Sequence, residues 1–139
     1  MAEKKIVTFE SIMRDLRAGN YAPVYILMGE ESYYIDKITD FISTNALTPE
    51  ERDFNQSVVF GSDVSSSQIV DMARRFPMMA ERQVVIVKEA QNIKNWEQLE
   101  KYVEKPVKST VLVLCHKNGS IDGRKKILAK AAATGVVFE

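Results

Sequence analysis

Four consecutive β-branched residues, Val-Val-Ile-Val at positions 84–87, constrain most strongly how this chain can fold. The run is too short for a typical helix and too continuous for a strand with one face in water. It predicts a strand buried on both faces, as in a parallel sheet that helices cover on either side. Just before it, Phe76, Met78 and Met79 flank Pro77 outside any periodic pattern. These large apolar side chains either pack into the core or contact a partner.

The rest of the chain alternates short apolar strands with amphipathic helices. We predict strands at residues 24–28, 54–60, 84–87, 110–115 and 136–138. The predicted helices begin after Thr8, at Ser32, at 65–67, near Asn95 and after Gly123, and residues 47–51 are expected to form a loop. Pro77 should end or kink the third helix at Phe76. This alternation predicts an α/β fold, a three-layer αβα sandwich with a five-stranded, mostly parallel sheet.

Length and charge limit the classes of function. The 139 residues fit a single domain with a sizeable core. The 19 basic and 19 acidic residues cancel, so the overall charge does not favour nucleic acid or an anionic membrane as a partner. The start is too polar for a signal peptide, and no apolar run approaches the roughly 20 residues of a membrane span. The single Cys115 cannot form an internal disulfide, so we expect a cytoplasmic protein.

Open parallel α/β sheets bind ligands at the carboxyl ends of their strands. Here the first predicted strand leads into Gly29, Glu30, Glu31 and Ser32. A phosphate loop needs glycines for close backbone approach and a Lys-Ser/Thr pair to reach phosphate and magnesium. This turn has one glycine, no such pair, and two carboxylates that would repel a triphosphate. We therefore expect no nucleotide here, and we interpret Ser32 as the N-cap of the following helix.

The only histidine, His116, follows Cys115 directly. Adjacent strand residues point to opposite faces, so this pair is not expected to meet as a nucleophile and base. Without further cysteines or histidines the chain has no predicted metal site, and we expect no cofactor. Cys115 is expected to be a small buried residue, and His116 a residue at the rim of the sheet.

Near the end of the fourth predicted strand, Lys117 and the later Arg124, Lys125 and Lys126 form a local basic cluster, to which Lys130 adds one charge. Exposed cations of this kind can contact the phosphates of DNA or an acidic partner. A charge run at the start of a helix is also typical of a solvated face. Both interpretations stay open.

Four segments together resemble one family. Residues 24–33 (V-Y-I-L-M-G-E-E-S-Y) resemble the Y-L-L-x-G-E-E-x-Y-L opening of the bacterial DNA polymerase III delta subunit. Residues 75–90 (R-F-P-M-M-A-E-R-Q-V-V-I-V-K-E-A) resemble its P-L-F-x-E-R-R-L-V-V-V-x-x-A segment. Residues 110–114 and 122–126 are similar to its T-x-L-V-L and D-x-R-x-K segments. The resemblance runs from about Tyr21 to Glu139.

The resemblance implies a clamp-loader subunit with a fold related to AAA+ and other P-loop ATPases, and with a degenerate phosphate loop. It implies no catalytic activity, since the family is grouped with DNA-directed DNA polymerases only as a holoenzyme component. Residues 1–139 would be the N-terminal AAA+-like domain, without the lid and collar domains that follow in the family. The final strand at 136–138 is consistent with a domain of a longer protein.

The resemblance also implies a function: this domain would bind and open the beta sliding clamp for loading onto primed DNA during replication. The clamp contact falls on Met78 and Met79, with Phe76 beside them, where the family usually has a Leu-Phe pair. Further expected partners are the gamma/tau and delta prime subunits, reached through the full-length protein, and DNA in the assembled complex. Arg82 is expected to have a structural role, pairing with Glu81 or near Glu89.

Two alternatives come from other classes of protein. In the first, residues 76–79 are only core and the domain is a structural unit of an AAA+ assembly. In the second, the chain is a nucleotide-binding ATPase, which the turn at Gly29 argues against. Exposure of Met78 and Met79 to solvent separates an interface from core packing.

Overall fold

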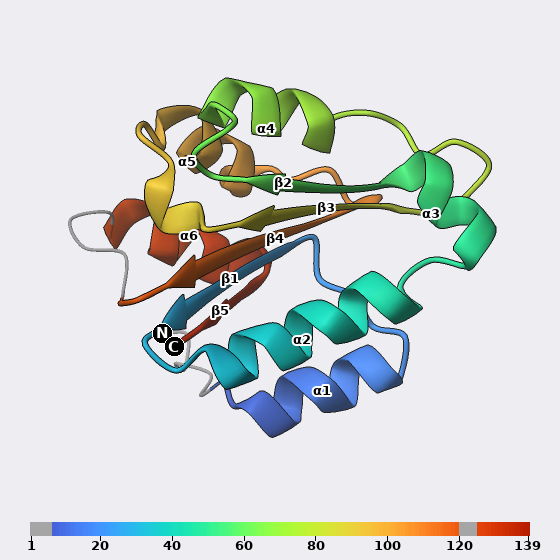
Figure 1. Cartoon of the computed structure of the whole chain (residues 1–139), viewed down its shortest axis with the longest axis horizontal. Helices are drawn as coiled ribbons and strands as arrows, with labels where there is room; N and C mark the ends of the chain where they lie inside the picture. Colours follow the sequence, from blue (N-terminus) through green and yellow to red (C-terminus); the bar gives the residue numbers. More distant parts are fainter. Residues whose placement is uncertain (1–6, 120–124) are drawn as a thin grey trace.

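One parallel sheet lies between two layers of helices in the computed structural model, which describes residues 7–119 and 125–139 (Figure 1). The strands run in the spatial order β2-β3-β4-β1-β5, and every neighbouring pair is parallel. Their bounds are Val24–Gly29 (β1), Gln56–Phe60 (β2), Gln83–Lys88 (β3), Thr110–Lys117 (β4) and Val136–Phe138 (β5). The predicted αβα sandwich with a five-stranded sheet is confirmed.

The helices divide between the two faces of this sheet. Helices α1 and α2 cover one face, and α4, α5 and α6 cover the other (Figure 1). The helical bounds are Phe9–Arg17 (α1), Ser32–Asn45 (α2), Pro49–Asn55 (α3), Ser66–Ala73 (α4), Glu97–Glu104 (α5) and Lys125–Thr134 (α6), with a 3₁₀ turn at Ala90–Asn92. None of the helices in the described ranges is long and apolar enough to cross a lipid bilayer.

Strand β3 is buried on both faces, as residues 84–87 predict. Val84 and Ile86 pack toward α1 and α2, whereas Val85 and Val87 pack into the core under α4, α5 and α6. Such two-sided burial is the reason the strand lacks the polar alternation of a half-exposed strand.

Side chains cap the N-termini of α1, α2 and α4. The hydroxyls of Thr8 and Ser65 accept hydrogen bonds from backbone amides three residues later, in capping boxes. The prediction that Ser32 caps α2 is wrong. Glu31 is the cap, and its carboxylate accepts the Tyr33 amide at 3.0 Å.

Helix α3 is absent from the sequence-based expectation, which placed a loop at 47–51 and the start of a strand at Phe54. Thr48 and Glu51 form a capping box, and Pro49 occupies the first helical turn. These residues satisfy the first free amides and preset the helical φ angle. The short helix therefore forms, and β2 begins only at Gln56.

Helix α4 ends at Ala73, earlier than the predicted end at Phe76, and the buried side chain of Gln83 is the hydrogen-bond donor to carbonyls at this end. The Nε2 of Gln83 lies 3.0 Å from the Met72 carbonyl, 3.2 Å from that of Ala73 and 2.7 Å from that of Arg75. The hydroxyl of Thr110 in β4 lies 2.9 Å from the same nitrogen and donates to the Ala73 carbonyl at 2.6 Å. The end of α4 is thereby joined to both central strands.

Replacing Gln83 with leucine should lower the free energy of unfolding by about 1–3 kcal/mol, because the partly buried carbonyls of Met72 and Arg75 lose this donor, whereas Ala73 keeps the Thr110 hydroxyl. Urea unfolding measures this loss. The matched control is Gln56→Leu, which removes a single hydrogen bond to the Ser43 carbonyl. Gln83→Leu should cost clearly more than this control, and equal losses would contradict the role assigned to Gln83.

Candidate functional site

The segment between α4 and β3 exposes its apolar side chains. Phe76 is 86% exposed, Met78 61% and Met79 100%. Exposed apolar residues are ordinary when scattered singly, but here three lie within four positions of one another along the chain. These side chains are therefore surface residues and do not pack into the core.

The C-terminal end of α3 holds the middle of this segment. The Asn55 side chain accepts the Met78 amide at 2.6 Å and donates to the Met78 carbonyl at 2.9 Å. Figure 1 shows the chain after α4 passing beside α3 before it enters β3. A residue 23 positions earlier in the chain thus binds both backbone groups of Met78.

Met79 follows with φ at 54°, in the left-handed region that non-glycine residues seldom adopt. Pro77, two residues earlier, restricts its own φ. The strained backbone at Met79 coincides with complete exposure of its side chain. Strain of this kind persists only where surrounding contacts maintain it.

Beside these methionines lies an apolar hollow of about 310 Å³. Phe54 of α3, 73% exposed, lines it together with Met78 and Met79, and Glu50 and Glu51 form its acidic edge. We call Phe54, Phe76, Met78 and Met79 the apolar surface.

Arg82, just before β3, contacts neither Glu81 nor the chain near Glu89, which were its expected partners. Its guanidinium lies 4.5 Å from the centre of the Tyr21 ring, and its Nη1 lies 3.4 Å from the Ala46 carbonyl. The structural role expected for Arg82 thus has different partners, because the side chain turns toward α2 and the loop before β1 and not along its own strand.

Sequence reasoning missed Phe54 and Asn55. It placed Phe54 in a strand and gave Asn55 no role. The signal that could have found them is the Thr48-Pro49-x-Glu51 pattern, which marks a helix start and puts both residues at the end of that helix.

The turn at Gly29 has the geometry of a chain reversal and of a helix cap. Gly29 has φ at 132°, which favours glycine. The Glu31 carboxylate already accepts an amide at the N-terminus of α2, the place where a phosphate would bind in a phosphate loop. A hollow of about 630 Å³ adjoins this turn, lined by Glu30, Glu31 and Tyr34 among others. The carboxylates of Glu30, Glu31 and Glu139 line this hollow and disfavour an anionic ligand.

The structure describes the side chains of Lys117, Lys126 and Lys130 from the predicted basic cluster. Lys117 forms an ion pair with Asp36 at 2.8 Å, and this hydrogen bond raises the pKa of Lys117. Lys130 pairs with Glu100 at 3.0 Å and also with Glu104. Lys126 is exposed on α6. Arg124 and the side chain of Lys125 lie outside the described residues.

Cys115 and His116 point to opposite sides of β4, as expected. The Cys115 thiol is buried among α1, α2 and the sheet, where burial raises its pKa and Thr39 Oγ1 lies 3.2 Å away. The His116 ring is partly buried on the other side, near Trp96, with Nδ1 2.9 Å from the Gly119 carbonyl. Within the described ranges no group of three His, Cys, Asp or Glu side chains is placed to hold a metal ion.

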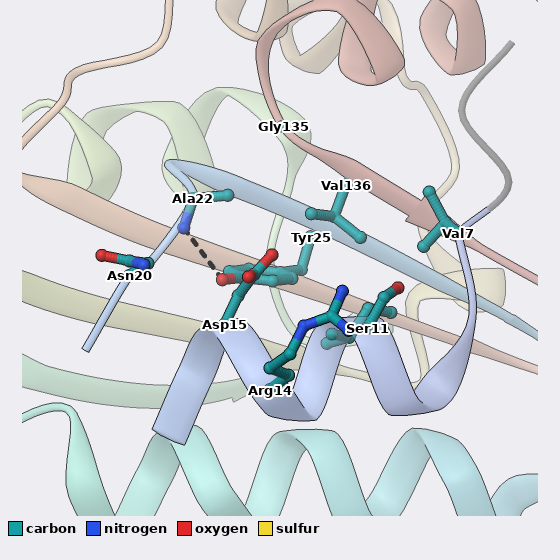
Figure 2. A pocket seen from close by; sticks show the side chains of 10 residues that line it. Val7, Ser11, Arg14, Asp15, Asn20, Ala22, Tyr25, Gly135 and Val136 are labelled. Atoms are coloured by element: carbon teal, nitrogen blue, oxygen red, sulfur yellow. Dashed lines mark hydrogen bonds between the residues drawn. The ribbon is translucent and has the colours of Figure 1, made fainter. Parts of the chain in front are cut away.

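A hollow of about 320 Å³ lies at the opposite end of the sheet, between α1 and the amino ends of β1 and β5. Figure 2 shows the side chains that line it. The hydroxyl of Tyr25 there accepts the Ala22 amide at 2.8 Å. Burial raises the pKa of Tyr25 to about 12. Ligands of open α/β sheets bind at the carboxyl ends of strands, so this hollow is not where the fold places chemistry.

Comparison with known proteins adds independent findings. A family model described as DNA polymerase III, delta subunit, matches residues 25–139. A curated relative, DNA polymerase III subunit delta of Bacillus subtilis (strain 168), is 32% identical over 126 residues, covering 84% of this chain and 36% of the relative. The chain thus spans about a third of that relative's length.

Two solved structures are similar. The Bacillus subtilis DNA clamp loader delta protein matches with a TM-score of 0.83 and 30% identity, over 95% of this chain and 42% of that one. A DNA polymerase III, gamma subunit-related protein of Thermotoga maritima matches with a TM-score of 0.54, over 96% of this chain and 46% of that one. At 14% identity the second match shows a shared fold alone.

The Tyr25 hydroxyl generates a pH-dependent prediction. A phenol whose pKa rises from 10.0 to about 12 on folding stabilises the fold fully below pH 10.0, and this contribution is lost as the pH rises through 12. Tyr25→Phe lacks this titration and leaves the Ala22 amide without its acceptor. The variant should be less stable by about 1 kcal/mol near pH 8, and the gap should shrink by about 1 kcal/mol near pH 11. Urea unfolding at both pH values measures the gap, and a constant gap would contradict the assignment.

Proposed function

This chain belongs to the DNA polymerase III delta-subunit family, the clamp-loader delta subunits of DNA replication, and on that premise we propose that its apolar surface binds the sliding clamp. The observation that carries the proposal is Met79, a fully exposed apolar side chain at a strained backbone position. Neither feature stabilises the isolated fold, and both suit a side chain that inserts into a pocket of a partner.

The size of the apolar surface is sufficient for a binding anchor. Fully burying a methionine or phenylalanine side chain contributes roughly 1.5–3 kcal/mol. Phe76, Met78 and Met79 together therefore supply the few dominant contacts that protein interfaces concentrate their energy in. Methionine is flexible and adapts to irregular pockets, so it can replace the Leu-Phe pair usual in the family. Phe76 and Phe54 add the aromatic area that the Met-Met pair lacks.

In this proposal the domain also opens one interface of the clamp ring, which allows loading onto primed DNA. A protein shifts a closed-to-open equilibrium only by binding the open form more tightly. The anchor would therefore fit the clamp pocket better once the neighbouring clamp interface has separated. The domain itself has no catalytic role in this step.

The remaining partners follow from the same premise. Residues 1–139 would be the N-terminal AAA+-like domain, and lid and collar domains would join it to the gamma/tau and delta prime subunits. Arg124, Lys125 and exposed Lys126 are the proposed contact with DNA or a partner subunit. Lys117 contributes less to such a contact, because Asp36 already pairs with it.

The double variant Met78→Ala with Met79→Ala should weaken binding to the cognate sliding clamp by about 10- to 100-fold, because two anchors are lost. Surface plasmon resonance with the full-length protein measures the affinity, and circular dichroism checks the fold. The matched control is Tyr33→Ala, which removes an exposed aromatic side chain from α2 and should leave the affinity unchanged. Unchanged affinity of the folded double variant would show that the anchor lies elsewhere.

Titration with Mg-ATP tests the nucleotide-binding alternative. Because Glu30 and Glu31 occupy the turn where a phosphate loop would have amides and a lysine, we expect no binding in calorimetry at about millimolar ATP. Binding that disappears when Gly29 is replaced by valine would revive an ATPase assignment.

A further inference from the structure

We infer that Asn55 is the positioning residue of the clamp-binding segment, holding the Met78 peptide so that Met79 is presented in one conformation. This inference rests on the proposed function. Asn55 follows the exposed Phe54 in the chain and binds the backbone of the exposed Met78, yet its own side chain is buried. A buried amide is costly unless it is hydrogen-bonded, so the role of this side chain beside exposed Phe54 and Met78 lies in its hydrogen bonds.

The hydrogen-bonding capacity of Asn55 matches the segment. Its Oδ1 accepts the Met78 amide, and its Nδ2 donates to the Met78 carbonyl at 2.9 Å and to the Glu51 carbonyl at 3.1 Å. The one acceptor and two donor hydrogens of the side chain therefore each have a partner. The bond to Glu51 fixes the side chain against α3, and the other two fix Met78 against that side chain.

Few other contacts hold this stretch of backbone. Within the described ranges, the backbone of residues 76–80 makes no hydrogen bonds other than the two between Met78 and the Asn55 side chain. Packing of the Met79 side chain does not fix its backbone, because this side chain is fully exposed. Met79 has a left-handed φ and directly follows Met78, whose amide and carbonyl bind Asn55. Without Asn55, the backbone at Met79 would relax toward commoner conformations.

Fixing the backbone at Met78 and Met79 before binding should raise the affinity for the partner. A flexible segment loses conformational entropy when it orders on a partner, and that loss subtracts from affinity. The entropy lost on ordering the backbone of one residue corresponds to roughly a tenfold change in Kd. Asn55 would remove this cost before the clamp arrives.

The test compares Asn55→Ala and Asn55→Asp with the original full-length protein for binding to the cognate sliding clamp. Both variants should bind about tenfold more weakly, since alanine makes none of the three bonds and aspartate cannot donate to either carbonyl. The matched control is Asn45→Ala. Asn45 makes the same bond to a carbonyl one turn back, to Phe41 at 3.0 Å, but lies at the end of α2. Its variant should bind normally.

A double-mutant cycle separates positioning from general stability. If Asn55 acts through Met79, Asn55→Ala should weaken binding much less in the Met79→Ala background than in the original protein. Equal effects in both backgrounds would overturn the inference. If Met79→Ala itself leaves binding unchanged, the proposed anchor fails. If Met79→Ala weakens binding but the folded Asn55 variants do not, only the positioning role fails.

Hydrogen exchange reports on the Met78 amide directly and shows in the same experiment whether the variant is folded. In the original protein the Met78 amide should be protected, although it lies in an exposed segment, because Asn55 accepts its hydrogen. In Asn55→Ala this protection should be lost while the Val85 amide in β3 remains protected. Rapid exchange of the Met78 amide in the original protein would overturn the inference.

Discussion

The hydrogen bonds between Gln83 and the end of α4 are the interaction on which the rest of the site depends. A helix leaves its last carbonyls without intrahelical partners, and in the interior these need donors. Gln83 supplies its amide to them from the first residue of β3, while Thr110 of β4 donates to the Ala73 carbonyl. This arrangement determines where the chain leaves α4 and where it re-enters the sheet. Between these two points the side chains of Phe76, Met78 and Met79 are exposed on the surface.

The outward segment is then shaped from a second direction. Asn55 at the end of α3 binds the backbone of Met78 in this segment. Near the start of β3, Arg82 contacts the Tyr21 ring and the Ala46 carbonyl. Polar side chains that are themselves fixed by the scaffold thus hold a strained, apolar stretch of backbone. Binding residues on loops commonly depend on rigid elements around them for their geometry. At the start of α2, the Glu31 carboxylate accepts the amide that would face a phosphate in a phosphate loop.

Much of the fold was predictable from local pattern. The run at 84–87 indicated a strand with two buried faces, and Thr8 and Ser65 indicated helix starts, because burial and capping act over a few residues. Helix α3 was missed because its seven residues are too few for an apolar period to stand out. Its capping box, formed by Thr48 and Glu51, was sufficient to predict the helix start where the apolar period was too short to do so. The apolar candidates Phe76, Met78 and Met79 were found, but pattern left open whether they were core or surface.

By itself, the sequence determined the alternation of strands and helices, the lack of a phosphate-binding motif at Gly29, and the family motifs that surround the methionine pair. The tertiary structure alone decided the strand order, the exposure of Met79 and the contact between Asn55 and Met78. The physical reason is range. Periodicity and capping report on neighbours along the chain, whereas exposure of an aperiodic loop depends on which distant elements pack around it. Asn55 and Met78 are joined only because β2 and β3 pair in parallel and bring the two strand entries to the same edge.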